Sequence, residues 1–299
     1  MTVLFVFVDG VGLGRKDPGI NPFARARLRV LDNFSGGEKT EPLAFDGRVV
    51  ALDATMGMEG RPQSATGQTA LLTGLNAARE NGGHLMGFTN SLLRGLLAEH
   101  SVLRRLRERG RKAIFANAFR PIFFLMPPAL QRRRLSATTV AALAAALPLR
   151  TVAEIPIGEA LYHDFTNRGL LAEGHDLPLR SPQEAARALA SLASRNDFVL
   201  YEYFQTDKAG HAQDWDRAIE VLEQLDQFLE TLLDNLDLAE TTVLLASDHG
   251  NVEDLSHGGH TLNPALGMAW GRGRKWAARR LTTVMDVAGV IMDLDAGGP

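Results

Sequence analysis

Aspartate and histidine residues directly follow several short apolar runs of this 299-residue chain, and such side chains can bind divalent cations. Asp9 follows the apolar residues Thr2–Val8, and Asp248 follows Thr241–Ala246. In open α/β sheets, ligands bind just beyond the carboxyl ends of the strands, so residues at these positions are expected to converge at one edge. The candidate ligands are Asp9, Asp207, His211, Asp248, His249 and His260.

The spacing of these residues suits chelation. Asp207 and His211 are four residues apart, which places both side chains on one face of a helical turn. Asp248 and His249 stand where a strand ends, and His260 lies on a loop shortly after them. An aspartate after a strand is more often a helix cap than a metal ligand. Six converging residues weaken that alternative, and three Asp with three His suffice for two divalent cations.

A candidate nucleophile lies in the small-residue segment 60–69, which contains Ser64, Thr66 and Thr69 and leads into an apolar helix. The N-terminus of a helix offers unpaired N–H groups and a positive dipole, which suit a phosphate group or an oxyanion. Ser64 or Thr66 could instead only cap this helix. A serine hydroxyl is a poor nucleophile at neutral pH, and a metal ion could lower its pKa.

Strands and helices alternate along the chain, which predicts an α/β fold with a mostly parallel sheet covered on both faces. The strands are expected at Thr2–Val8, Ala113–Ala116, Phe198–Tyr203 and Thr241–Ala246. The strongest helical periodicity starts at Trp215 and runs to Leu232. Further helices are expected at Thr69–Ala78, Val102–Arg109, Thr139–Ala146 and Pro182–Ser194.

Six prolines interrupt the pattern between Arg120 and Arg180, which indicates a small inserted lid over residues 120–180. Residues 1–119 and 181–299 then form one catalytic core.

Composition excludes several classes of protein and site. The absence of cysteine rules out disulfides, Cys-ligated zinc and thiol nucleophiles. A net charge of -3 argues against a nucleic-acid binder, and no apolar run reaches the ~18 residues of a membrane helix. Met1–Val8 lacks a basic region, so we expect a cytoplasmic protein.

The ordered motifs resemble the alkaline phosphatase superfamily, and most closely its metalloenzyme branch with cofactor-independent phosphoglycerate mutase and phosphopentomutase. The resemblance covers roughly residues 1–100 and 185–299 and implies an alkaline-phosphatase-like three-layer core. The motifs that carry it are Val8-Asp9-Gly10-Val11-Gly12, Ser64-Ala65-Thr66-Gly67, Asp207-Lys208-Ala209-Gly210-His211, Ser247-Asp248-His249-Gly250-Asn251 with Glu253, and His260-Thr261 with Asn263-Pro264.

The resemblance also implies roles. One ion would be bound by Asp207, His211 and His260. The other would be bound by Asp9, Asp248, His249 and the Ser64 oxygen. The family uses Mn or Zn at these positions, and Ser64 occupies the position of its nucleophile. The implied reaction is phosphoryl transfer through a phosphoserine, with two ions stabilising the attacking and leaving oxygens.

The substrate is expected to be a small phosphorylated metabolite. The mutases carry a large second domain, whereas this chain has only the short segment 120–180, so a phosphatase or other phosphoryl transferase is favoured over a phosphomutase. A non-catalytic metal-binding relative is the third alternative. Sulfatases share the superfamily, but their modified nucleophile requires Pro and Arg where this chain has Thr66 and Gln68. Candidate substrate contacts are Thr66, Arg120, His257 and the run Arg132-Arg133-Arg134, whereas His84, His100, His163 and His175 are expected to be structural or surface residues.

Overall fold

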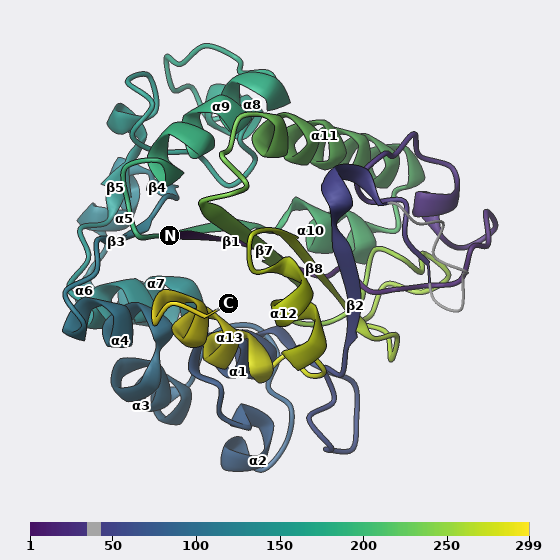
Figure 1. The fold of residues 1–299 in the computed structure, drawn as a ribbon, viewed down its shortest axis with the longest axis horizontal. Helices are drawn as coiled ribbons and strands as arrows, with labels where there is room; N and C mark the ends of the chain where they lie inside the picture. The colour runs from purple at the N-terminus through teal and green to yellow at the C-terminus, as the bar shows by residue number, and fades with distance from the viewer. Residues whose placement is uncertain (35–42, 299) are drawn as a thin grey trace.

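A six-stranded sheet crosses the centre of the molecule in the computed structural model, which describes residues 1–34 and 43–298 (Figure 1). Its strand order is β2-β8-β7-β1-β6-β3. The strands are β1 (Thr2–Val8), β2 (Arg48–Leu52), β3 (Ala113–Phe115), β6 (Phe198–Tyr203), β7 (Thr241–Ala246) and β8 (Ala265–Gly271).

The four predicted strands are present and run parallel to one another. β1 pairs in parallel with β6 and with β7, and β3 pairs in parallel with β6. β8 pairs antiparallel with both β7 and β2, so it alone opposes the direction of the other five. The predicted α/β fold with a mostly parallel sheet is therefore confirmed, with β8 as a reversed strand that the sequence pattern did not indicate.

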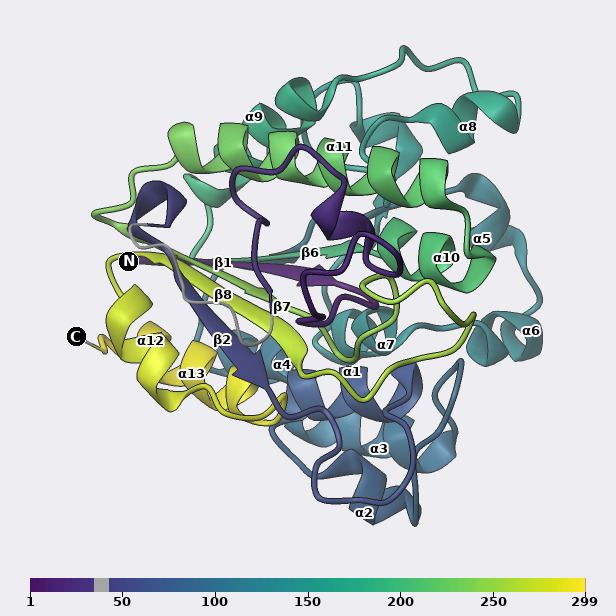
Figure 2. The same ribbon diagram turned by 90° about the vertical axis from the view of Figure 1, so that its right-hand side faces the viewer.

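Helices cover both faces of the sheet and give the expected three layers (Figures 1 and 2). Successive residues of β1 point to opposite faces, as in any strand. Val3, Phe5 and Phe7 belong to a core formed with α1 (Ser64–Thr73), α4 (Val102–Glu108), α7 (Ala137–Ala144) and α13 (Asp286–Asp295). Leu4, Val6 and Val8 belong to a second core formed with α9 (Pro182–Ala193) and α11 (Trp215–Asp234). Because both faces are buried, β1 is apolar from Val3 to Val8.

Several helix boundaries differ from the expected ones. The segment predicted as one helix over Thr69–Ala78 forms two helices, because Gly74 adopts a left-handed conformation and ends the first one. This first helix begins at Ser64, earlier than predicted. The long helices are α1 (Ser64–Thr73), α3 (Ser91–His100), α4 (Val102–Glu108), α7 (Ala137–Ala144), α9 (Pro182–Ala193), α10 (Gln205–Ala212), α11 (Trp215–Asp234), α12 (Arg274–Arg280) and α13 (Asp286–Asp295), and the shorter ones are α2 (Ala77–Asn81), α5 (Pro121–Leu125), α6 (Pro128–Arg133) and α8 (Arg168–Ala172).

Residues 120–180 contain two kinds of structure. α7 packs into the main core against α1, α3 and α4. The remainder includes β5 (Arg150–Thr151), which pairs with β4 (Ala118–Phe119), just before this segment, to form a second, two-stranded sheet beside a small core around Ile155 and Tyr162. Among the described residues, no helix is long and apolar enough to cross a membrane.

Candidate metal centre and nucleophile

Three neighbouring parallel strands, β7, β1 and β6, end at the same edge of the sheet. Asp9 follows β1 directly, and Asp248 and His249 follow β7. After β6 the chain turns at Phe204 into α10, whose first turn carries Asp207. The parallel arrangement therefore delivers side chains from three distant segments to one place, as the pattern predicts.

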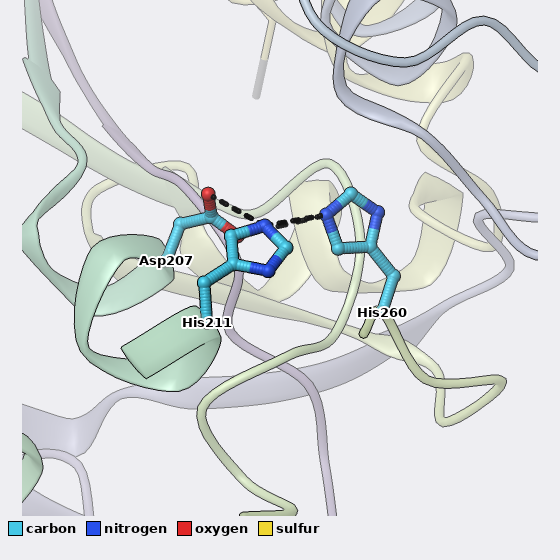
Figure 3. A group of neighbouring side chains, drawn as sticks. All are labelled: Asp207, His211 and His260. Carbon is cyan, nitrogen blue, oxygen red and sulfur yellow. Dashed lines mark hydrogen bonds and ion pairs between the residues drawn. The ribbon is translucent and has the colours of Figure 1, made fainter. Parts of the chain in front are cut away.

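Asp207, His211 and His260 form the first cluster (Figure 3). Asp207 and His211 lie on one face of α10, whereas His260 comes from the loop after β7. The Nε2 atom of His211 is 3.4 Å from Asp207 Oδ2, and the Nε2 atom of His260 is 3.7 Å from Asp207 Oδ1. The two Nε2 atoms are 3.3 Å apart.

The far nitrogens of both imidazoles are held by backbone carbonyls. His211 Nδ1 is 2.8 Å from the oxygen of Gly258, and His260 Nδ1 is 2.9 Å from that of Pro62. A carbonyl can only accept, so each Nδ1 carries a proton and donates it, and the Nε2 atoms of both rings face Asp207. This arrangement is typical of metal-binding histidines, whose other nitrogen donates to a carbonyl or carboxylate.

Asp9, Asp248 and His249 form the second cluster, beside the Ser64 hydroxyl. His249 Nε2 is 3.4 Å from Asp9 Oδ1, 3.4 Å from Asp248 Oδ2 and 3.0 Å from Ser64 Oγ. Asp248 and His249 are fully buried, and Asp9 is nearly so. Among the described residues, Asp9 Oδ1 and Asp248 Oδ2 are buried carboxylate oxygens without a hydrogen-bond partner.

The arrangement around His249 differs from a Ser-His-Asp triad. In such a triad the aspartate holds Nδ1 of the histidine while Nε2 faces the serine. Here both carboxylates face Nε2, on the same side as Ser64, and Nδ1 has no hydrogen-bond partner among the described residues. Two carboxylate oxygens, an imidazole nitrogen and a hydroxyl oxygen directed at one point fit a divalent cation.

The electrostatics of the second cluster also fit a cation. Burial, with a further contribution from the neighbouring Asp248, raises the pKa of Asp9 well above its usual range. Burial and the charge of Asp207 raise the pKa of Asp248 to about 8. Burial lowers the pKa of His249, so its imidazole is neutral at pH 7. Positive charge bound among these groups would offset both the carboxylate repulsion and the cost of burying the carboxylates.

The two clusters adjoin each other. The rings of His249 and His260 stack with their centroids 3.6 Å apart and their planes 16° from parallel. Burial also lowers the pKa of His260, which favours a second neutral ring at this junction. Protonation of one ring would make protonation of the other less favourable, so the stack favours two neutral rings, as ligands of two adjacent cations would be.

Close backbone approaches bring α1 and the β1 loop to the clusters. Ser64 is the first residue of α1, and one turn later Gln68 donates to Asp9 Oδ2 at 3.1 Å. A methyl group at Gly67 would lie 2.9 Å from the carbonyl oxygen of Asp248, so only glycine permits this approach. Gly10 has a φ of +71°, and a side chain there would meet Asp207.

Glu253 joins the loops that carry the predicted ligands. Its side chain is 1% exposed and accepts four hydrogen bonds. The donors are the backbone N–H groups of Gly12 and Asn251, each at 2.8 Å, the Thr261 hydroxyl at 2.5 Å and the Asn263 amide at 3.1 Å. The Asn251 side chain in turn donates to Asp207 Oδ1 at 2.7 Å. One buried carboxylate thus ties together segments following β1 and β7.

The other predicted contacts are not members of the two clusters. The Thr66 hydroxyl donates to the Gln63 carbonyl at 3.1 Å within the start of α1. Arg120 pairs with Glu173 and lines a cavity beside the site. His257 lies on the loop before His260, where its Nδ1 accepts from the backbone of Gly259 at 3.3 Å. In the run Arg132-Arg133-Arg134, all three residues are exposed and Arg134 lines the same cavity.

This cavity, of about 530 Å³, is lined in part by Asp9, Ser64 and Asp207. The sequence does not predict its walls, because isolated aromatic residues are typical of an ordinary hydrophobic core. His163, expected to be structural or a surface residue, lines the cavity too. Other lining residues that the motifs did not indicate are Phe119, Phe123, Tyr162, Glu202 and Phe204.

Comparison with known proteins supports the resemblance that the motifs predict. Residues 173–294 match the family model of the metalloenzyme superfamily. The chain is 30% identical over 139 residues to the 2,3-bisphosphoglycerate-independent phosphoglycerate mutase of Halobacterium salinarum and 28% identical over 123 residues to that of Desulforudis audaxviator. These matches cover 42% and 39% of this chain but only 27% and 24% of the relatives, so the shared part is about a quarter of each mutase.

Solved structures show the fold. A Pyrococcus horikoshii protein superposes with a TM-score of 0.62 at 16% identity, covering 100% of this chain and 97% of that one. Alkaline phosphatase from the Antarctic bacterium TAB5 gives 0.53 at 14% identity, covering 100% and 99%. The C-terminal periplasmic domain of EptC from Escherichia coli gives 0.55 at 11%, covering 98% and 81%. The fold is therefore alkaline-phosphatase-like, as predicted.

Proposed function

We propose that the chain binds two divalent cations, Mn or Zn, and uses Ser64 to transfer a phosphoryl group from a small phosphorylated metabolite. The observation that carries this proposal is the facing pair of imidazoles, His211 and His260, whose Nε2 atoms lie 3.3 Å apart next to Asp207. Because both Nδ1 atoms donate to backbone carbonyls, the two Nε2 atoms are available to bind one cation together with Asp207. In the proposed assignment Asp207, His211 and His260 hold one cation, and Asp9, Asp248, His249 and Ser64 hold the other.

The chain's own residues would prepare the nucleophile. Ser64 stands at the N-terminus of α1, where the helix dipole favours the negative phosphoryl oxygens. Gln68 donates to Asp9, and His249 Nε2 lies 3.0 Å from the Ser64 hydroxyl oxygen, so these contacts hold the side chains around the hydroxyl in place. Bound cations would lower the pKa of that hydroxyl and neutralise charge on the phosphoryl group.

The reaction would then take place in two transfers at Ser64. Its oxygen forms a bond to phosphorus while the bond from phosphorus to the substrate's alcohol oxygen breaks, and that alcohol leaves with a proton. A water molecule next attacks the phosphoserine, which releases inorganic phosphate and returns the serine hydroxyl. If a second hydroxyl of the substrate replaced the water, the same site would act as a phosphomutase.

The mutase alternative is favoured by one observation, the sequence similarity to phosphoglycerate mutases. The matched part is about a quarter of each mutase, so hydrolysis stays the first proposal. A protein that bound both cations but never received phosphate on Ser64 would be a non-catalytic relative. From the same substrate, hydrolysis gives free phosphate, the mutase reaction gives a positional isomer and the non-catalytic relative gives no product.

The test is phosphate release from a generic phosphomonoester by protein loaded with Mn or Zn. Wild type is compared with Ser64→Ala and with Ser194→Ala, which removes an exposed hydroxyl at the end of α9. We expect cation-dependent release that Ser64→Ala loses and Ser194→Ala retains. Undiminished release by Ser64→Ala would contradict the proposal. A labelled sugar phosphate that yields a positional isomer in place of free phosphate would instead establish the mutase reaction.

A further inference from the structure

The cavity beside Ser64 is much larger than a phosphoryl group requires. Its volume of about 530 Å³ falls within the usual range for pockets that enclose a whole organic ligand. Asp9, Ser64 and Asp207 are among its lining residues, so a phosphate bound beside them would leave most of the cavity for the substrate's alcohol portion. The chemistry of the walls therefore indicates which alcohols fit.

One wall is a cluster of phenylalanines from β3, β4 and α5. The ring centroids of Phe115 and Phe119 are 6.1 Å apart, and those of Phe119 and Phe123 are 4.7 Å apart. All three residues line the cavity. Phe88 and Ile122 extend this apolar surface to the rim, where both are about half exposed.

A stack of aromatic rings forms a second wall. His163 lies between Tyr162 and Phe204, with ring centroids 4.0 Å and 4.2 Å away. Burial lowers the pKa of His163 to about 3, so at neutral pH the ring is an uncharged aromatic surface. These three residues line the same cavity as the phenylalanine cluster.

Several polar groups that line the cavity are paired with one another or with neighbouring residues. Asn117 donates to the Glu202 carbonyl and accepts from the Glu202 N–H, both at 2.8 Å. Thr138 donates to the Glu202 carboxyl at 2.6 Å. Arg120 is paired with Glu173. Lys208 and Arg134 are cationic side chains that also line the cavity. Apart from these two, a sugar or glycerate body with several hydroxyls would find few free partners, whereas a flat apolar body would lose little by leaving water.

We propose that this cavity selects phosphomonoesters whose alcohol portion carries an aromatic ring, which would lie between the phenylalanine cluster and the Tyr162-His163-Phe204 stack. Aromatic pairs prefer offset or edge-to-face contacts at centroid separations of 4.5–7 Å, which both walls can offer. The choice of substrate rests on the proposed phosphoryl transfer at Ser64. Binding of the aromatic ring depends on the cavity alone.

Binding to the Ser64→Ala protein, loaded with Mn or Zn, tests the proposal without turnover. The fluorescence anisotropy of 2-naphthyl phosphate gives its affinity, and competition gives that of ethyl phosphate. We expect the naphthyl ester to bind at least tenfold more tightly. In this background Phe119→Leu should reduce that preference at least threefold, whereas Phe124→Leu, which alters a ring of the same cluster that does not line the cavity, should leave it unchanged.

Equal affinities for the two esters, or no binding of either, would overturn the proposal. So would a preference that Phe119→Leu leaves intact in a folded protein, as judged by circular dichroism. Selective binding of the naphthyl ester combined with no Ser64-dependent turnover in wild type would refute the proposed phosphoryl transfer and support the aromatic pocket. The two claims therefore fail separately.

Discussion

Removing the Glu253 carboxylate should weaken both the fold and the metal centre. In Glu253→Ala, the backbone N–H groups of Gly12 and Asn251 lose their acceptor in a buried site. Hydrogen bonds to a charged group contribute about 1.5–3 kcal/mol each, and they are not additive. With four such bonds and partial relief by entering water, we expect a loss of about 4 kcal/mol in the free energy of unfolding.

Glu253→Gln should cost less, about 2 kcal/mol, because its amide oxygen still accepts from both backbone N–H groups. Its NH₂ group would instead face the Asn263 amide, so two donors would meet. Since Glu253 orients the loops after β1 and β7, metal affinity should fall about 10–100-fold in both variants.

Urea unfolding of the metal-free proteins measures the first effect, and titration calorimetry with Mn measures the second. Glu240→Gln, an exposed carboxylate, is the matched control and should behave as wild type. An unfolding free energy of Glu253→Ala within 1 kcal/mol of wild type would refute the reasoning. Unaltered metal affinity in a folded Glu253→Ala protein would refute the prediction that Glu253 orients the metal-binding loops.

Two further changes give distinct outcomes. Burial raises the pKa of Glu202 from 4.5 to about 7, so the unfolded chain releases this proton at lower pH than the folded protein does, and stability should decline as pH rises through that window. The free energy of unfolding of Glu202→Gln should therefore exceed that of wild type by up to about 3 kcal/mol at pH 8 and by little at pH 4. Urea titrations at several pH values measure this difference, and a difference that does not change with pH would contradict the prediction. Gly67→Ala should lower metal affinity measured by calorimetry, because its methyl group would displace Asp248, although alanine favours helices. Gly95→Ala, in open space on α3, should leave that affinity unchanged, and equal affinities of the two variants would argue against the close approach.

The parts of the fold that the sequence predicts are those with a strong periodic signal. β1, β6 and β7 are short runs dominated by apolar, β-branched and aromatic residues, and α11 shows a clear apolar stripe, so the sequence predicts each of them nearly to the residue. The polar residues that follow these strands were found for the same reason. Because parallel strands end at one edge, correct strands were enough to predict that Asp9, Asp207 and Asp248 converge.

Features that depend on tertiary contacts were not predictable in this way. β8 contains Gly267 and small alanines, whose intrinsic strand preference is low, and it is held between β2 and β7 by pairing and burial. The sequence predicts the start of α1 too late, because Ser64 and Gly67 are residue types typical of loops. In the structure both belong to the helix, where Gly67 packs against Asp248. The aromatic cavity unites residues from Phe88 to Phe204, and no local pattern links them.

The most direct test of the account is the metal content of the purified protein after loading with Mn or Zn and dialysis. We expect two ions per wild-type chain, one in Asp207→Asn and one in Asp248→Asn, because each variant removes a carboxylate from a single cluster. Asp216→Asn, an exposed residue of α11, is the control and should retain both ions. Wild type without retained metal, or the same content in all four proteins, would contradict the assignment of two metal sites around Ser64.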